Sequence, residues 1–252
     1  MTDLPNLTAD ERERYQWQLW IPDFGEEGQR RLKAATILVS RIGGVGGTAA
    51  LQLAAAGVGK LILAHGGELR LNDLNRQLLM STPGLGQRRV DLAIARLREF
   101  NPHVEIETVA ENISETNAAE LVSRCDLVVS AAPLFSERLL MNREAVRQRK
   151  PLVDSAMYEL EGRLTTIVPG QTPCLACIYP ELPVNWKREF PVIAPVSSTV
   201  GSLAAMEAIK VLARLGDPLL GRMLIFDLRE MSFQTVPIPR RVNCPICGEL
   251  AR

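Results

Sequence analysis

The sequence lacks excess charge of either sign, because its 29 Lys and Arg residues balance its 29 Asp and Glu residues. It has no run of the ~18–20 apolar residues that cross a bilayer. Its first residues, MTDLPNLTADERERY, carry neither the basic nor the apolar stretch of a secretory signal. These absences argue against a bulk nucleic-acid partner and against a membrane location. We therefore expect a cytoplasmic protein.

What the sequence does contain is a globular composition, with 46% of its 252 residues hydrophobic and 23% charged. A chain of this length can bury a sizeable core in one domain. Neither an internal repeat nor a low-complexity segment divides it. We expect a single domain over residues 1–252, with helices in 1–35, an alternating half in 36–156 and an antiparallel half in 157–252.

Apolar strands alternate with amphipathic helices through the first half of the chain. The strands are expected at 36–40, 60–64, 104–109, 126–131 and 152–155, with helices between them at 47–56, 87–100, 115–124 and 136–149. Thr8 and Glu11 form the capping-box start of an earlier helix through residue 19, and a second helix fits 26–35. Alternation of this length predicts an α/β fold with a doubly wound, Rossmann-like parallel sheet.

The pattern changes after residue 156. Three strands joined by short turns are expected at 163–168, 223–228 and 232–236, and short turns imply antiparallel pairing. We expect these strands to extend the parallel sheet. The polar, proline-rich stretch 173–193 predicts a loop, and 200–215 predicts a long helix that faces the core or a dimer partner rather than a membrane.

Four of the five cysteines form two CxxC pairs, Cys174 with Cys177 and Cys244 with Cys247. In a reducing cytosol such pairs indicate metal binding rather than disulfides. Each CxxC turn places two thiolates on one side, and two turns complete the tetrahedral four-sulfur shell of a structural zinc site. We predict a structural zinc clamp that ties the 173–193 loop to the C-terminal region. Unrelated redox dithiols are the alternative.

The stretch 36-TILVSRIGGVGG-47 predicts a buried strand, a glycine-rich turn and the start of a helix. Gly43, Gly44 and Gly46 would let a phosphate approach the helix N-terminus, where free N–H groups favour anions. The same glycines can instead serve tight helix–strand packing. Two positions depart from a nucleotide-binding fingerprint. Arg41 stands where the first glycine is expected, and His65 stands where an acid would hold the ribose.

The order of motifs resembles the HesA/MoeB/ThiF family, the bacterial relatives of ubiquitin-activating enzymes. The resemblance runs from about residue 14 to 248 and rests on RYQWQL, IGGVGGTAALQLAAAGVGKLIL, GGELRLNDLNRQ, GQRRVDLA and the two CxxC pairs. GGELRLNDLNRQ is most similar to HesA-type members. The resemblance implies ATP- and Mg²⁺-dependent adenylylation of the C-terminal glycine of a small ubiquitin-like sulfur carrier. It also implies a homodimer and a structural zinc ion.

The resemblance makes 36–156 the nucleotide-binding half. The residues that it places at the nucleotide are Arg41, Gly43, Gly44, Gly46, Asp73, Arg76, Gln77 and Arg89. In the Arg76–Gln77 pair the arginine is expected to face the ATP phosphates, which a guanidinium can bind bidentately. An arginine there can also cap its own short helix. Asp73 replaces an asparagine of the family, and Arg89 replaces a phosphate-binding lysine.

Other family positions are altered. Trp17 replaces an arginine that reaches the partner subunit's ATP site, and Pro133 replaces an aspartate that holds Mg²⁺. Lys187 stands near the position of a cysteine that some members carry, which excludes thioester chemistry there. We hypothesise that Arg41 either fills part of the phosphate space or clamps a different anion. The sequence identifies no catalytic residue.

These altered positions leave two functions open. The first is an ATP-dependent adenylyltransferase that acts on a carrier protein with a Gly-Gly C-terminus or on a peptide. The second is a pseudoenzyme that binds a carrier protein, a peptide or an active homologue. Losing one transition-state charge contact costs ~3 kcal/mol, so several altered positions in one site would strongly impair catalysis. An enzyme acting on a different nucleotide or small acid is a third possibility.

Overall fold

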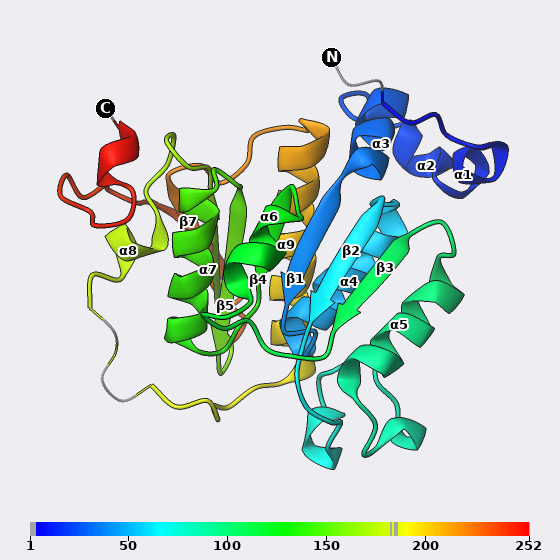
Figure 1. The fold of residues 1–252 in the computed structure, drawn as a ribbon, viewed down its shortest axis with the longest axis horizontal. Helices are drawn as coiled ribbons and strands as arrows, with labels where there is room; N and C mark the ends of the chain where they lie inside the picture. The colour runs from blue at the N-terminus through cyan, green and yellow to red at the C-terminus, as the bar shows by residue number, and fades with distance from the viewer. Residues whose placement is uncertain (1–3, 182, 184–185, 252) are drawn as a thin grey trace.

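An eight-stranded mixed sheet runs through the protein (Figure 1). The computed structural model describes residues 4–181, 183 and 186–251 of the chain. The strand order is β3-β2-β1-β4-β5-β6-β7-β8. The first five strands pair in parallel, and the pairs from β5 to β8 are antiparallel. The predicted fold class is therefore confirmed.

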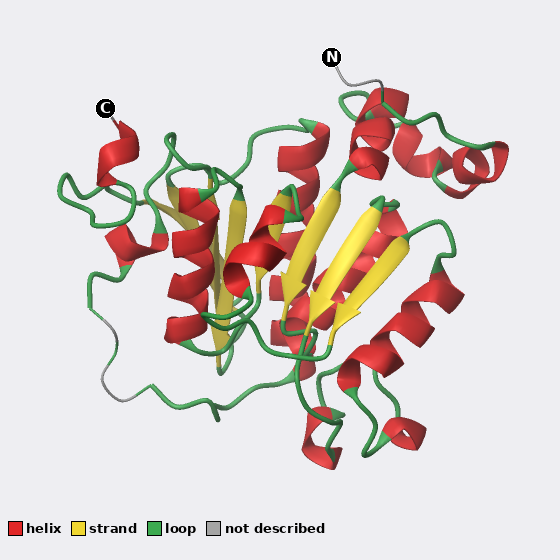
Figure 2. Ribbon diagram, in the orientation of Figure 1, coloured by secondary structure: helices red, strands yellow, loops and turns green. Residues whose placement is uncertain are grey.

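The strands are β1 (Thr36–Ser40), β2 (Lys60–Ala64), β3 (Glu105–Val109), β4 (Leu127–Ser130), β5 (Leu152–Tyr158), β6 (Glu161–Ile167), β7 (Arg222–Asp227) and β8 (Ser232–Pro237). The helices are α1 (Ala9–Arg14), α2 (Gln16–Leu19), α3 (Gly25–Ala34), α4 (Gly44–Ala56), α5 (Arg89–Phe100), α6 (Ala118–Ser123), α7 (Phe135–Arg147), α8 (Leu175–Ile178) and α9 (Ala194–Ala213). Short 3-10 turns lie at Leu71–Asp73, Thr82–Gly84 and Gly248–Ala251. Figure 2 shows how helices cover both faces of the sheet.

Alternate residues of the parallel strands bury opposite faces of the sheet. In β1, Ile37 and Val39 belong to the core that α3, α4, α5 and α9 cover, whereas Leu38 belongs to the core under α6 and α7. Because successive side chains of a strand point to opposite faces, a strand that is buried on both sides is apolar throughout. This is why TILVS and KLILA contain no clean polar–apolar alternation.

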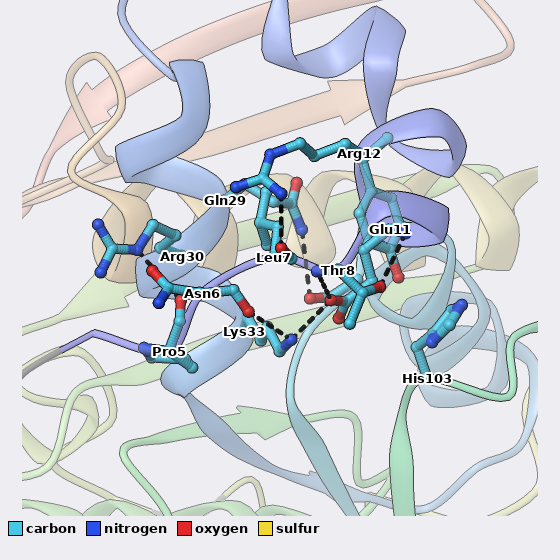
Figure 3. Close-up of polar contacts among 12 residues, drawn as sticks. Pro5, Asn6, Leu7, Thr8, Glu11, Arg12, Gln29, Arg30, Lys33 and His103 are labelled. Carbon is cyan, nitrogen blue, oxygen red and sulfur yellow. Dashed lines mark hydrogen bonds and ion pairs between the residues drawn. The ribbon is translucent and has the colours of Figure 1, made fainter.

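The N-terminal segment is held on the body of the protein by polar contacts (Figure 3). The expected capping box forms, because Glu11 N donates to Thr8 Oγ1 at 3.2 Å and Thr8 N donates to Glu11 Oε2 at 2.7 Å. Lys33 Nζ of α3 donates to the same Glu11 carboxylate at 2.6 Å. The Arg12 guanidinium also donates to Leu7 O at 2.7 Å. These contacts fix the position of α1 against α3.

The clearest differences from the sequence prediction lie in the helices. The expected helix through residue 19 is two helices, α1 and α2, which meet at Tyr15. The 173–193 loop contains α8, and the long helix begins at Ala194 rather than at residue 200. Pro195 lies in the first turn of α9, where proline costs no hydrogen bond, so it starts this helix rather than excluding it.

Helix α9 is long and apolar enough to cross a bilayer by length and composition alone. However, half of its most apolar window is buried inside the protein. It packs against α4, α3 and β5, and residues such as Val200 and Ala204 are fully buried. These contacts are those of a core helix, as the sequence predicts.

Candidate functional site: an arginine-rich pocket and a cysteine cluster

A pocket lies at the carboxyl ends of the parallel strands, where the strand order changes direction between β1 and β4. Arg41 follows β1, His65 follows β2, Ala131–Pro133 follow β4, and Ser155 belongs to β5, and all of them line the pocket. Open α/β sheets bind ligands at such a switch point, because the loops there diverge and leave a crevice.

The three predicted glycines have different surroundings. Gly43 and Gly44 line the pocket at the N-terminus of α4. A Cβ on Gly43 would have ordinary contacts, the nearest at 3.7 Å, whereas one on Gly44 would lie 2.8 Å from Ser197 Oγ. Gly46 does not line the pocket, and a Cβ there would lie 2.4 Å from Arg41 O. Gly46 therefore serves close packing of helix on turn, Gly44 allows Ser197 to pack closely, and Gly43 leaves room beside the pocket.

Arg41 occupies the first position of the turn with φ 60, a left-handed conformation that is uncommon for residues other than glycine. Its guanidinium forms a forked ion pair with Glu137 of α7, with Nε to Oε2 at 2.9 Å and Nη2 to Oε2 at 2.7 Å. Both side chains are buried. The anion that Arg41 clamps in this structure is thus a carboxylate of the chain itself, which neutralises the arginine and ties the turn to α7.

Asp73 organises the opposite wall of the pocket. Its Oδ2 accepts hydrogen bonds from Arg89 Nη2 at 2.5 Å and from Arg70 N at 3.0 Å, and its Oδ1 accepts from Gln77 Nε2 at 2.8 Å. Burial alone would raise the pKa of Asp73, but these donors outweigh it and hold the pKa below its usual value. The predicted residues Asp73, Gln77 and Arg89 therefore form one connected group.

A third buried ion pair borders the pocket. Arg138 of α7 lines the pocket, and its Nε donates to Asp154 Oδ1 at 3.0 Å. Both residues are 2% exposed, which makes this the most deeply buried ion pair among the described residues. The Arg138 guanidinium also lies over the rings of Phe135 and Tyr179, 4.8 and 5.5 Å from their centroids. These contacts fix α7 to the end of β5.

Two further arginines line the pocket without full compensation. Arg76 approaches Asp73 only at 3.5 Å and shares that carboxylate with Arg89. Its Nη1 donates to Asn72 O and Asn75 Oδ1, so the local capping contact predicted as the alternative does form. Arg188 has no ion-pair partner in the described part of the chain. The pocket thus has a surplus of positive charge, which favours an anionic ligand.

His65 is buried beside these arginines. Burial, followed by the nearby charges of Arg89 and Arg41, lowers the pKa of His65 to about 3, so the imidazole is neutral at physiological pH. Its Nδ1 has no hydrogen-bond partner, and neither has Gln77 Oε1 or Arg89 Nε. Buried polar atoms normally have partners. Three exceptions among the residues that line one pocket indicate unused capacity for a polar ligand.

An aromatic cluster borders the other end of the pocket. Trp186 lies 5.2 Å from Phe135 and 5.9 Å from Tyr158, measured between ring centroids. Its Nε1 donates to Pro133 O at 2.7 Å. No pattern in the sequence placed Trp186 or Arg188 at the pocket. Both residues reach the pocket because of the path of the 186–193 segment, which no local pattern specifies.

Trp17 is not among the pocket-lining residues. It lies on α2 with 80% of its surface exposed, and its ring stacks on Trp20 with centroids 6.3 Å apart. Within this chain, therefore, α2 contributes nothing to the pocket.

The four paired cysteines form one buried cluster, as predicted. Cys174 Sγ lies 3.7 Å from Cys244 Sγ, and Cys177 Sγ lies 3.5 Å from Cys247 Sγ. All four sulfur atoms lie within 4.8 Å of one another. Zn–S bonds of ~2.3 Å in a tetrahedron separate the sulfur atoms by ~3.8 Å, so the cluster fits a four-coordinate metal ion. The cluster joins α8 to the C-terminal turn, the two regions that the predicted zinc clamp would connect.

Comparisons with known proteins agree with this architecture. The protein HesA of heterocysts from Trichormus variabilis is 48% identical over 243 residues, which cover 96% of this chain and 91% of that relative. The sulfur carrier protein adenylyltransferase of Thermus thermophilus is 36% identical over 251 residues, covering 96% and 93%. The crystal structure of E. coli MccB with MccA-N7isoASN has a TM-score of 0.85 at 22% identity, covers 96% of this chain and 76% of that one, and shows the shared fold. Residues 15–246 match the ThiF family, and the chain belongs to that family.

Proposed function

We propose that the chain is an adenylyltransferase that transfers AMP from ATP to the terminal carboxylate of a small carrier protein or peptide. The observation that carries the proposal is the surplus positive charge of Arg76 and Arg188, which line the same pocket as the Gly43–Gly44 turn. A helix N-terminus with glycines and guanidinium groups is suited to a polyphosphate. The relative from Thermus thermophilus bears the name of this activity, and another from Haloferax volcanii is named SAMP-activating enzyme E1.

In the proposed reaction a carboxylate oxygen of the substrate attacks the α-phosphorus of ATP. A new P–O bond forms, the bond to the bridging oxygen of the β-phosphate breaks, and pyrophosphate leaves with the electron pair. The products are an acyl adenylate and pyrophosphate. Arg76 and Arg188 would stabilise the charge that moves onto the phosphates, and the α4 N-terminus would orient them.

The test is exchange of labelled pyrophosphate into ATP. The purified chain would be mixed with ATP, labelled pyrophosphate and a purified small protein of the same genome that ends in Gly-Gly. We expect label in ATP only when the carrier is present. The matched control is the same carrier without its last glycine, which should give no exchange. Exchange that is absent although ATP and carrier both bind would contradict the proposal.

A second candidate function is a pseudoenzyme that holds a carrier protein, a peptide or an active homologue. The specific observation in its favour is the Arg41–Glu137 ion pair, which commits a guanidinium of the turn to the chain itself. Binding of the carrier without pyrophosphate exchange, at unchanged affinity with and without ATP, would support this function over the first.

We further propose that the cysteine cluster holds a structural zinc ion and that the chain forms a homodimer. The exposed Trp17 and Trp20 offer an apolar surface for a second copy. Metal analysis should find one zinc ion per chain, and Cys244→Ser should lose it together with thermal stability. Sedimentation should give twice the mass of 27.8 kDa. The cytoplasmic location stays a prediction from the sequence.

A further inference from the structure

The pocket can be tested for a fit to Mg²⁺, which the family resemblance implies. Mg²⁺ requires six oxygen ligands in near-octahedral geometry and is normally held by one or two protein carboxylates together with substrate phosphates. A carboxylate that already accepts several charge-assisted hydrogen bonds is a poor ligand, because those bonds must first be broken. The question is whether the pocket offers a free carboxylate.

Asp73 is the only carboxylate that lines the pocket among the residues the structure describes. Both of its oxygen atoms are already used. Oδ2 accepts from Arg89 and from the Arg70 N–H, while Oδ1 accepts from Gln77. Freeing Oδ2 would leave the buried Arg89 guanidinium without its partner, which is costly. Freeing Oδ1 would leave the buried Gln77 amide without its acceptor. Asp73 is therefore a structural anchor of the pocket wall.

The carboxylates behind the pocket are committed in the same way. Glu137 holds Arg41 through a forked ion pair, and Asp154 holds Arg138. The segment that follows β4 reads Ala131-Ala132-Pro133, and none of these side chains has an oxygen atom. Glu68, Glu111 and Glu189 line a neighbouring groove, which shares Arg76 and Arg188 with the pocket but contains neither Gly43 nor Gly44. No free carboxylate thus faces the glycine turn in the described part of the chain.

We propose that this pocket binds the polyphosphate of its nucleotide as the metal-free anion. Guanidinium groups of Arg76 and Arg188 supply the positive charge at the phosphates. An arginine fork can contact two phosphate oxygens at once and stays charged at every physiological pH. This inference rests on the proposed nucleotide-binding function and specifies the form of nucleotide that the pocket accepts.

The experiment is a calorimetric titration of the full-length protein with ATP, first in EDTA and then with excess Mg²⁺. A zinc-loaded preparation is used, and zinc retention after EDTA is checked by metal analysis. The inference predicts affinities that agree within about threefold, or tighter binding in EDTA. Binding at least tenfold weaker in EDTA would overturn the inference and leave the proposed function intact. Absence of ATP binding in both conditions, with the protein folded, would overturn the inference and the proposed function together.

A pair of variants at one position sharpens the test. Pro133→Asp introduces a carboxylate beside the pocket, and Pro133→Ala removes the proline without adding an oxygen atom. The hydrogen bond from Trp186 is to the backbone oxygen of residue 133 and remains available in both. ATP affinity of Pro133→Asp should become Mg²⁺-dependent by at least tenfold, while Pro133→Ala should behave like the wild type. If Mg²⁺ strengthened ATP binding tenfold or more in both Pro133→Ala and the wild type, the inference would be wrong.

Discussion

The arginines of the pocket fall into two groups that differ in their partners. Arg41, Arg89 and Arg138 each hold a buried carboxylate of the chain. In the part of the chain that the structure describes, Arg76 has only a distant, shared carboxylate and Arg188 has none. The first group joins separate elements, because Arg41 ties the glycine turn to α7 and Arg138 ties α7 to β5. The second group remains available to bind an anionic ligand.

The difference shows that the number of arginines in a pocket does not by itself indicate how strongly the pocket binds an anion. A guanidinium neutralised by a forked carboxylate contributes to the stability of the loops, and only uncompensated charge attracts an anion over a distance. The two groups should therefore respond differently to mutation. Changes to the paired group should alter stability, and changes to the second group should alter ligand binding.

The largest expected effect is that of Asp154→Asn. It leaves the Arg138 guanidinium buried without a countercharge, which typically costs about 3–5 kcal/mol. Chemical denaturation should show this loss. The double variant Arg138→Met/Asp154→Asn should recover part of it, since no buried charge remains. A single variant as stable as the wild type would show that this pair is not structural.

A smaller effect is expected at His65. Its folded pKa of about 3 lies below the ordinary value of 6.5, so the unfolded chain binds a proton first as the pH falls. The neutral His65 therefore contributes fully to the free energy of unfolding above pH ~6.5, and this contribution is lost as the pH falls towards the folded pKa. The expected loss in the free energy of unfolding is about 2–3 kcal/mol between pH 6.5 and 4.5.

The variant His65→Gln should lack this part of the acid sensitivity in denaturation curves measured across that range. The matched control is His103→Gln, at an exposed turn, which should keep it. An unchanged pH profile in His65→Gln would mean that the imidazole is not held neutral by its burial and the nearby arginines. Asp73 also loses favourable contacts in acid, but its pKa is lowered, so its effect appears below this window.

Glu137→Gln should move Arg41 from the first group to the second. We expect a loss of about 1–3 kcal/mol in stability, because a buried charged hydrogen bond is removed, and a gain of several-fold in ATP affinity as Arg41 becomes uncompensated. Glu144→Gln is the control on the same helix, since Glu144 pairs with the exposed Arg147. ATP affinity that falls in Glu137→Gln would contradict the separation into two groups.

Much of the fold could be predicted because its signals are local. The alternation of strands and helices, the capping box at Thr8 and the two CxxC pairs are each visible within a few residues. The cysteine cluster follows once the fold brings α8 to the C-terminal turn. Element ends were less predictable, as the early start of α9 shows.

The pocket was only partly predictable because its energetics depend on pairs that are far apart in the sequence. Arg41 and Glu137 are separated by 96 positions, and nothing near Arg41 indicates that a carboxylate neutralises it. That Gly46 serves packing rather than ligand contact also became visible only in the structure, from the short distance between a Cβ at this position and Arg41 O. Arg188 escaped prediction because it lies on an irregular segment whose path is set by tertiary contacts.

The most direct measurement is a calorimetric titration of ATP into the wild type and the double variant Arg76→Ala/Arg188→Ala, with thermal unfolding recorded for both. Each charged hydrogen bond to phosphate is worth about 1.5–3 kcal/mol, so we predict affinity at least tenfold weaker at an unchanged unfolding temperature. The variant Arg88→Ala, which removes an exposed arginine paired with Asp91, should bind like the wild type. Equal ATP affinity in the double variant and the wild type would contradict the account.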